Sequence, residues 1–323
     1  MDAVRVALQS THRYPDDDCG ELRRVLAQSH HVRPDQVLVT AGSTGMLSLL
    51  CQAFLAPGRN AVTSERSFIV YGMVGRATGA RLLETPMRGD EFDLDAILNA
   101  ITSDTRLVFL ANPNNPTGTM IEAGAVEEFL AQVPDHVVVV LDEAYAEFAA
   151  RFAQMRNVQY PNAVDYVRSG ANVVVLRTFS KVHGLAGLRI GYGLGPAELL
   201  GYCARMANAY SVSSVAQVGA LAALEDADHI ERAVSNNYAQ AEVLQHGLEE
   251  LGYGARPTSA NFVYCDVGGD AADFALRLRE RGVGVRPLGA WGAATCIRVS
   301  IGTPEEDRIF LEAARSIAQG CRR

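Results

Sequence analysis

The chain carries the stretch VVVVLDEAY at residues 137–145, in which five consecutive aliphatic residues precede two carboxylates. An apolar run without alternation is typical of a strand in a parallel sheet that is covered on both faces. Six further segments have strand character, at 37–40, 61–63, 81–85, 107–111, 173–178 and 190–194. Helical patterns separate most of these strands, and strand–helix alternation over this length predicts an α/β fold.

The pattern changes beyond residue 230. A long helical stretch is followed by shorter strands and helices, at 229–251, 261–266, 271–281, 296–301 and 304–319. These elements predict a small C-terminal α+β domain. We therefore expect an N-terminal segment at residues 1–30, a large domain at 31–230 and a small domain at 231–323.

The composition argues against several classes of protein. A hydrophobic fraction of 48% and a charged fraction of 20% are those of a globular protein with a sizeable core. A net charge of −8 argues against a nucleic acid or an anionic membrane as partner. No apolar run approaches the roughly 18 residues that span a bilayer, and the N-terminus lacks a signal-peptide pattern.

The cysteines are scattered along the chain without CxxC spacing: Cys19, Cys51, Cys203, Cys265, Cys296 and Cys321. This spacing suggests neither a zinc site nor a disulfide framework. We therefore expect a reducing cytoplasm as the location and no bound metal.

Lys181 is the only lysine, because 28 of the 29 lysine and arginine residues are arginines. A genome biased toward arginine codons explains the arginines but not the one lysine that remains. A guanidinium stays charged and is a poor nucleophile, whereas an amine can lose its proton and react. Two alternatives follow, a lysine retained by chance and a lysine whose chemistry arginine cannot replace.

Lys181 lies in a segment that combines hydroxyl groups, glycines and a second cation. One strand candidate ends in TFSK at 178–181, and GLAGLR follows at 184–189. Such a loop places an amine beside hydroxyl and guanidinium groups that can bind a phosphate. A surface lysine beside a turn is the alternative, and the complete motif argues against it.

Three further segments place polar groups directly after strands. Asp142 ends the most hydrophobic strand, at the edge where open α/β sheets bind ligands, although an aspartate there could equally cap the next helix. The loop NPNNPTG at 112–118 has prolines and a glycine that fix a turn, which can aim the amide of Asn115 at a ligand; an ordinary loop is the alternative. Ser43 and Thr44, flanked by glycines, lie between a strand and a helix, where N–H groups can approach a phosphate, but many such turns look similar.

Together these segments resemble the fold-type-I aminotransferases that depend on pyridoxal phosphate (PLP), and most closely the histidinol-phosphate aminotransferase branch. The four motifs occur in the family's order, and the resemblance extends from RYP at 13–15 to RVSIGT at 298–303. The family implies an aspartate aminotransferase-like α/β fold, with a mainly parallel seven-stranded sheet in the large PLP-binding domain and a smaller C-terminal α+β domain. It also implies PLP as the cofactor.

The resemblance assigns roles to three residues that would be catalytic, Lys181, Asp142 and Tyr145. Lys181 would hold PLP covalently and later move a proton on the substrate, while Asp142 would bind the pyridine nitrogen. Asn115 and Tyr145 would hold the phenolic oxygen. Phe68 matches the aromatic residue that stacks on the ring, although a core phenylalanine at the start of a helix fits the pattern too.

Anion-binding positions match as well. The phosphate of PLP would be bound by Ser43, Thr44, Thr178, Ser180 and Arg189. Arg298 matches the arginine that binds the substrate's carboxylate or phosphate, and Arg286 matches a second anion-binding arginine in the small domain. On the pattern alone either arginine could lie on the surface instead.

Tyr14 matches a tyrosine that reaches the cofactor phosphate of the neighbouring subunit, so the resemblance implies a homodimer with shared active sites. Family members carry a longer N-terminal arm that helps to close the substrate pocket, whereas residues 1–12 precede Arg13 here. Either the start is misassigned or the pocket is more open. The difference concerns the substrate and not the cofactor.

The reaction implied is transamination, with glutamate as amino donor and histidinol phosphate, in histidine biosynthesis, as the expected second substrate. One alternative is decarboxylation of a phosphorylated amino acid such as threonine phosphate, which would release CO2 and need no second substrate. Transamination of aromatic amino acids is another. A non-catalytic PLP-binding regulatory module would carry a basic helix-turn-helix segment upstream, which we do not expect before Arg13 in so acidic a chain.

Overall fold

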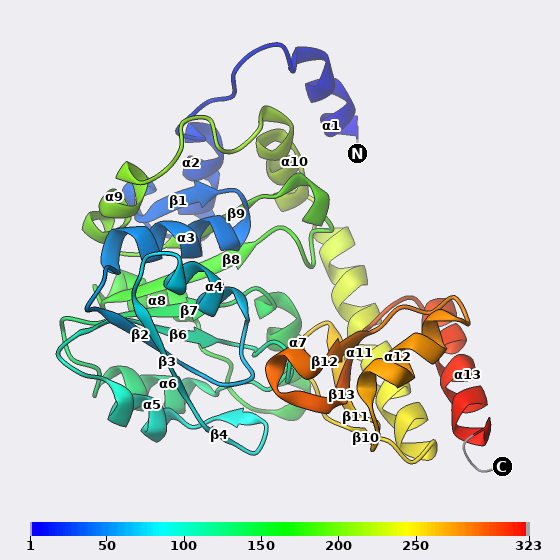
Figure 1. The fold of residues 1–323 in the computed structure, drawn as a ribbon. Coiled ribbons are helices and arrows are strands. Elements are labelled where there is room, and N and C mark those ends of the chain that lie inside the picture. Colours follow the sequence, from blue (N-terminus) through cyan, green and yellow to red (C-terminus); the bar gives the residue numbers. More distant parts are fainter. Residues whose placement is uncertain (1, 321–323) are drawn as a thin grey trace.

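The computed structural model describes residues 2–320, and Met1 and residues 321–323, among them Cys321, lie outside the described residues. Figure 1 shows a large part around a central sheet and a smaller part formed by the C-terminal end of the chain. Within residues 2–320, no helix combines the length and the apolar character needed to cross a membrane.

The large sheet has seven strands in the order β1-β9-β8-β7-β6-β2-β3. Their bounds are β1 Val37–Thr40, β2 Asn60–Ser64, β3 Arg81–Thr85, β6 Thr105–Ala111, β7 Val138–Asp142, β8 Val173–Thr178 and β9 Gly191–Leu194. Each strand pairs in parallel with its neighbour along the run β8, β7, β6, β2 and β3. In contrast, β9 is antiparallel to both β8 and β1. The expected mainly parallel seven-stranded sheet is therefore confirmed.

Helices cover both faces of this sheet. In β7, Val139 and Leu141 pack into one apolar core, and Val138 and Val140 pack into the other. The first core is completed by α2 Gly20–Ser29, α5 Leu94–Ala100, α6 Ala123–Leu130, α8 Ala163–Arg168 and α10 Ser214–Leu224. The second is completed by α3 Gly42–Phe54, α4 Val70–Arg76 and α9 Ala197–Arg205. Because both faces are buried, only the strand ends are open to a ligand.

The smaller part is built on a four-stranded antiparallel sheet in the order β10-β11-β13-β12. Its strands are β10 Gly254–Ala255, β11 Phe262–Asp266, β12 Arg286–Leu288 and β13 Ala293–Ser300, and its helices are α11 Ala227–Glu250, α12 Ala271–Arg279 and α13 Pro304–Gly320. A separate apolar core lies between these helices and the sheet. The expected small α+β part is confirmed, while the two boundaries between the three expected segments stay a prediction.

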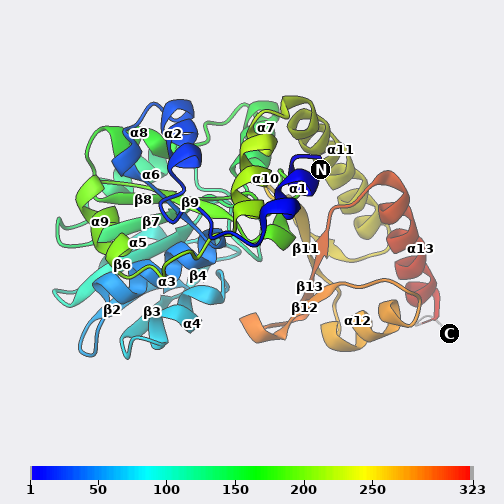
Figure 2. The same ribbon diagram turned by 90° about the horizontal axis from the view of Figure 1, so that it is seen from above.

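The two parts meet where α11 packs against α7 Ala146–Arg156, which follows β7. At the other end of the chain, α1 Asp2–Ala7 lies beside α10 (Figure 2). Short elements complete the described chain: the hairpin strands β4 Met87–Arg88 and β5 Glu91–Phe92, and the 3-10 turns η1 Leu8–Ser10, η2 Pro34–Gln36, η3 Ala186–Leu188 and η4 Gly289–Trp291.

The carboxyl ends of β6, β7 and β8 lie side by side, because these strands are parallel neighbours. β6 ends at Ala111, which lies opposite Asp142 at the end of β7, and β8 ends at Thr178. The segments that follow these three strands therefore begin at one edge of the sheet.

Candidate active site

A cavity of about 570 Å³ lies at this edge, between the two parts of the molecule. Twelve of the thirteen site residues expected from the sequence line it: Ser43, Thr44, Phe68, Asn115, Asp142, Tyr145, Thr178, Ser180, Lys181, Arg189, Arg286 and Arg298. Tyr14 does not line the cavity of its own chain, and its side chain is 81% exposed. The structure thus brings the predicted residues together, while the role of each stays a prediction.

Lys181 lies three residues beyond the end of β8, with its side chain at the cavity wall. Its Nζ is 5.0 Å from the centroid of the Tyr145 ring. Burial lowers the pKa of this amine, and the positive charges of Arg298 and Arg189 lower it further, against the opposite effect of Asp142. The amine therefore loses its proton more readily than an exposed lysine does, as a nucleophile or a base must.

Asp142 is only 4% exposed and has one oxygen unused. Its Oδ2 accepts a hydrogen bond of 3.0 Å from the Tyr71 hydroxyl, whereas Oδ1 is buried and has no hydrogen-bond partner among the described residues. Burial raises the pKa of Asp142 to about 6, and Tyr71, the Ala144 amide and Lys181 oppose this rise. A buried acceptor without a donor is costly, so the site is suited to a ligand that presents an N–H to Oδ1.

Hydroxyl groups and a guanidinium form a cradle next to the lysine. The Thr178 hydroxyl donates to Ser180 Oγ at 2.9 Å and accepts from the Ser180 amide at 3.1 Å. Arg189 Nη1 donates to Ser180 Oγ at 3.4 Å and to the Ala186 carbonyl at 3.0 Å. These residues line the cavity, and hydroxyl and guanidinium groups of this kind can bind an anion.

The first turn of α3 forms the other wall of the cradle. The sequence placed Ser43 and Thr44 between a strand and a helix, but α3 begins at Gly42, so both are helical residues whose N–H groups lie at the helix N-terminus. A Cβ at Gly42, whose φ is +75°, would lie 2.7 Å from Arg189 Nη2. Only glycine lets the helix start so close to the guanidinium, and this arrangement favours a phosphate.

Asn115, Tyr145 and Phe68 line the same cavity as the cradle and Asp142. Asn115 Oδ1 accepts a hydrogen bond from Arg298 Nη1, which leaves the amide nitrogen of Asn115 as a donor. Burial raises the pKa of Tyr145, so its hydroxyl stays protonated and can donate. Phe68 is half-buried and lines the cavity, so it is not enclosed in the core.

Two arginines face the cavity from the smaller sheet. Arg286 on β12 and Arg298 on β13 are register partners, so two like charges lie opposite each other. Burial lowers the pKa of Arg298, and the charge of Arg286 lowers it further. Such a pair is unfavourable without an anion between the side chains, and this favours a carboxylate or a phosphate as ligand.

Some lining residues were missed by the sequence analysis, namely Ile69, Ala111, Pro113, Ala144, Ala186, Ala290 and Trp291. Trp291, the only tryptophan, lies in η4 and its Nε1 donates to the Ser67 carbonyl at 2.8 Å. This bond joins the smaller part to the segment before Phe68. That Trp291 is the single tryptophan was the only sequence signal for its place in the site, because nothing in the sequence shows that the β12–β13 connection reaches the large part.

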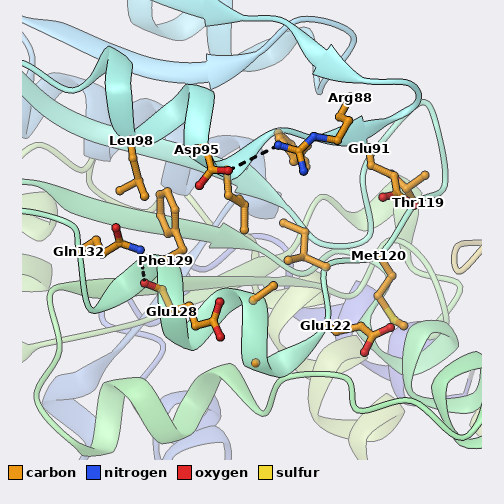
Figure 3. A pocket seen from close by; sticks show the side chains of 15 residues that line it. Arg88, Glu91, Asp95, Leu98, Thr119, Met120, Glu122, Glu128, Phe129 and Gln132 are labelled. Atoms are coloured by element: carbon orange, nitrogen blue, oxygen red, sulfur yellow. Dashed lines mark hydrogen bonds and ion pairs between the residues drawn. The ribbon is translucent and has the colours of Figure 1, made fainter.

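Figure 3 shows a second cavity, of about 530 Å³, between the β4–β5 hairpin, α5 and α6. Its rim carries exposed carboxylates, including Glu91, Glu122 and Glu128, and Arg88 pairs with Asp95 across it. None of its lining residues lines the first cavity. It offers no reactive lysine or anion cradle, so the first cavity is the candidate active site.

Comparisons by family model, by sequence and by structure all match this chain to aminotransferases. The family model "Aminotransferase class I and II" matches residues 2–313. The chain is 41% identical to histidinol-phosphate aminotransferase 2 of Pseudomonas fluorescens (98% of this chain, 84% of that one) and 42% identical to its namesake from Pseudomonas aeruginosa (97% and 83%). A crystal structure of histidinol-phosphate aminotransferase from Sinorhizobium meliloti in complex with pyridoxal-5'-phosphate superimposes with a TM-score of 0.89 at 29% identity, covering 99% of this chain and 86% of that one.

Proposed function

Because the chain belongs to the class I and II aminotransferases, we propose that it is a PLP-dependent enzyme of histidine biosynthesis that exchanges an amino group between glutamate and histidinol phosphate. The observation that carries this proposal is the cavity itself, where the only lysine and a buried carboxylate with one oxygen lacking a donor face the same space. The relatives named above support the reaction and the substrate.

The residues present fit PLP. Asp142 Oδ1 needs a donor, which a protonated pyridine nitrogen supplies. Asn115 and Tyr145 have donors left for the phenolic oxygen, and Phe68 would lie against the ring. The phosphate would be bound by Ser43, Thr44, Thr178, Ser180 and Arg189.

Lys181 would carry PLP and act as acid and base. When bound, PLP supplies a carbonyl that takes up the amino group and a ring that withdraws electrons from the substrate's α-carbon. The lowered pKa of Lys181 suits its amine to removing the proton at that carbon and returning it, a role that contributes on the order of 10² to 10⁴ in rate. Asp142, as a carboxylate, would keep the ring nitrogen protonated.

Arg286 and Arg298 would bind the anionic groups of both substrates. Glutamate carries two carboxylates, whereas histidinol phosphate carries a phosphate and no carboxylate. The like-charged pair on β12 and β13 gains most from the anion with the higher charge.

We also propose a homodimer in which Tyr14 reaches the partner's site, since Tyr14 is exposed and does not line the cavity of its own chain. The cytoplasm is the proposed location. The cysteines within residues 2–320 are free, buried thiols, which suits a reducing compartment.

The substrate is tested by comparing histidinol phosphate with histidinol, which lacks only the phosphate. The wild type is expected to show a far higher kcat/KM for histidinol phosphate. Arg286→Ala should reduce this preference at least tenfold, since a charged hydrogen bond is worth about 1.5–3 kcal/mol. Arg279→Ala, in the same part of the molecule but outside the cavity, is the control. Equal rates with both amines, or CO2 release from phosphothreonine, would contradict the proposed substrate.

A further inference from the structure

Tyr71 is a buried residue outside the sequence motifs, and it contacts Asp142 directly. It lies in the first turn of α4, is 1% exposed, and donates its hydroxyl proton to Asp142 Oδ2 at 3.0 Å. With Oδ2 occupied in this way, Oδ1 is the oxygen of Asp142 that remains without a partner.

The ring of Tyr71 is held from two sides. It stacks on Phe109 of β6, with ring centroids 4.8 Å apart and 8° between the planes. The Phe68 ring meets it edge-on at 5.6 Å and 89°. These contacts leave the hydroxyl little freedom, so its direction toward Asp142 is fixed by packing.

One helical turn links Tyr71 to Phe68, the residue proposed to lie against the ring. The Tyr71 amide donates to the Phe68 carbonyl at 3.0 Å, and the two side chains are three residues apart, on the same side of the turn. Phe68 lines the cavity directly, while Tyr71 reaches it only through Asp142.

We propose that Tyr71 is a positioning residue: its hydroxyl holds the Asp142 carboxylate in the orientation and charge state that a pyridine nitrogen requires at Oδ1. This inference rests on the proposed function. Tyr71 is not a catalytic residue, because it touches neither the substrate position nor Lys181.

The electrostatics of the pair support this role. Burial raises the pKa of Asp142, and the Tyr71 hydrogen bond is the largest of the effects that oppose it, ahead of the Ala144 amide and Lys181. Tyr145, whose pKa burial also raises, is a further titratable group that faces the pair. Burial raises the pKa of Tyr71 itself well above its ordinary range, so this hydroxyl stays protonated and can donate to Asp142. Without it, Asp142 would take up a proton at higher pH.

The test is Tyr71→Phe, which keeps the ring and removes only the hydroxyl. The full-length protein is titrated with PLP across a range of pH, and kcat is measured over the same range. The acid limb of PLP affinity and of kcat is expected to move up by about one to two pH units, the equivalent of one charged hydrogen bond. Both should approach the wild-type values at alkaline pH, where Asp142 is ionised without help.

Tyr192→Phe is the matched control. Its hydroxyl is also buried and bonded, to His30 Nε2 at 2.9 Å, but Tyr192 does not line the cavity. This variant should leave both acid limbs unmoved. A pH-independent loss in Tyr71→Phe, or an unmoved acid limb, would overturn the positioning role.

Asp142→Asn separates this inference from the proposed function. If Tyr71 acts through Asp142, adding Tyr71→Phe to Asp142→Asn changes neither PLP affinity nor kcat further. Full turnover in Asp142→Asn would contradict the proposed function itself. An additive effect of the two substitutions would contradict only the inference about Tyr71.

Discussion

At the scale of single residues, Asp142 should destabilise the protein when no cofactor is bound. Burial raises its folded-state pKa from 3.8 to about 6, so the folded protein holds this proton more tightly than the unfolded chain does. Its contribution to stability is therefore complete below pH 3.8 and is lost as the pH rises through about 6. Near neutral pH the ionised, buried carboxylate costs on the order of 2–3 kcal/mol.

Asp142→Asn removes this charge and keeps the shape. We expect the cofactor-free variant to have a higher free energy of unfolding than the wild type above pH 7, and to lose the advantage below about pH 4. Urea unfolding at both pH values measures the difference. Because the same substitution should abolish most turnover, stability and activity would move in opposite directions. An asparagine variant less stable than wild type at alkaline pH would contradict this view of Asp142.

The sequence allowed Lys181, Asp142 and Asn115 to be predicted because each lies at or shortly after the end of a strand, and the composition of that strand reveals it. Tyr71 and Trp291 could not be predicted in the same way. The Tyr71–Asp142 bond joins residues 71 positions apart across the face of the sheet, and Trp291 reaches the cavity from the smaller part. Such contacts depend on how elements pack, which local patterns do not encode.

At the scale of elements, β7 and β8 are joined at their carboxyl ends by a buried ion pair. Arg177 Nη2 lies 2.6 Å from Glu143 Oε2, with only 1% of the Glu143 side chain exposed, and Glu147 lies within 3.8 Å of the same guanidinium. The Tyr160 hydroxyl is near Glu143 at 3.3 Å and donates to the Asn112 carbonyl at 2.6 Å. This network ties together the segments that carry Asp142, Lys181 and Asn115.

Arg177→Met should therefore destabilise the fold by about 3–5 kcal/mol, because Glu143 would remain as a buried, uncompensated charge. Adding Glu143→Gln should recover part of the loss, and urea unfolding of the two variants measures both effects. Arg308→Met, which breaks only exposed pairs with Glu305 and Glu312, is the control and should change stability little. If Arg177→Met alone were as stable as the wild type, the network would not support the site.

The long apolar strands of the large sheet were predictable, because burial on both faces leaves a continuous hydrophobic signal. β4, β5, β10 and β12 were not predicted, since strands of two or three residues are too short to show a pattern. The six residues of α1 make fewer than two helical turns and show no helical period. The beginning of α3 was placed too late. Gly42 looked like a loop residue, but its left-handed φ of +75° belongs to the first residue of the helix beside Arg189.

At the scale of the whole molecule, the proposed homodimer makes Tyr14 part of another chain's site. Tyr14 is 81% exposed, and its ring stacks on that of Tyr210, with centroids 4.6 Å apart. Light scattering should give the mass of two chains. Tyr14→Phe and Lys181→Ala should each impair turnover, and subunits of the two variants can be mixed after mild dissociation.

A mixed dimer would contain one site with both native residues, since each chain supplies what the other lacks. Activity should therefore return to about a quarter of the wild-type value after random reassociation, as two-fold symmetry requires. Each variant reassociated alone is the control. If mixing restores nothing while mixed dimers form, Tyr14 does not serve the partner's site.

The most direct test of the central claim is the absorbance of the PLP-loaded protein during separate additions of glutamate and histidinol phosphate. We predict that each amine removes the band of the lysine-bound cofactor, that the matching oxo acid restores it, and that Lys181→Ala shows no such exchange and no turnover. A cofactor spectrum that responds to neither amine, or steady transamination by Lys181→Ala, would contradict the claim.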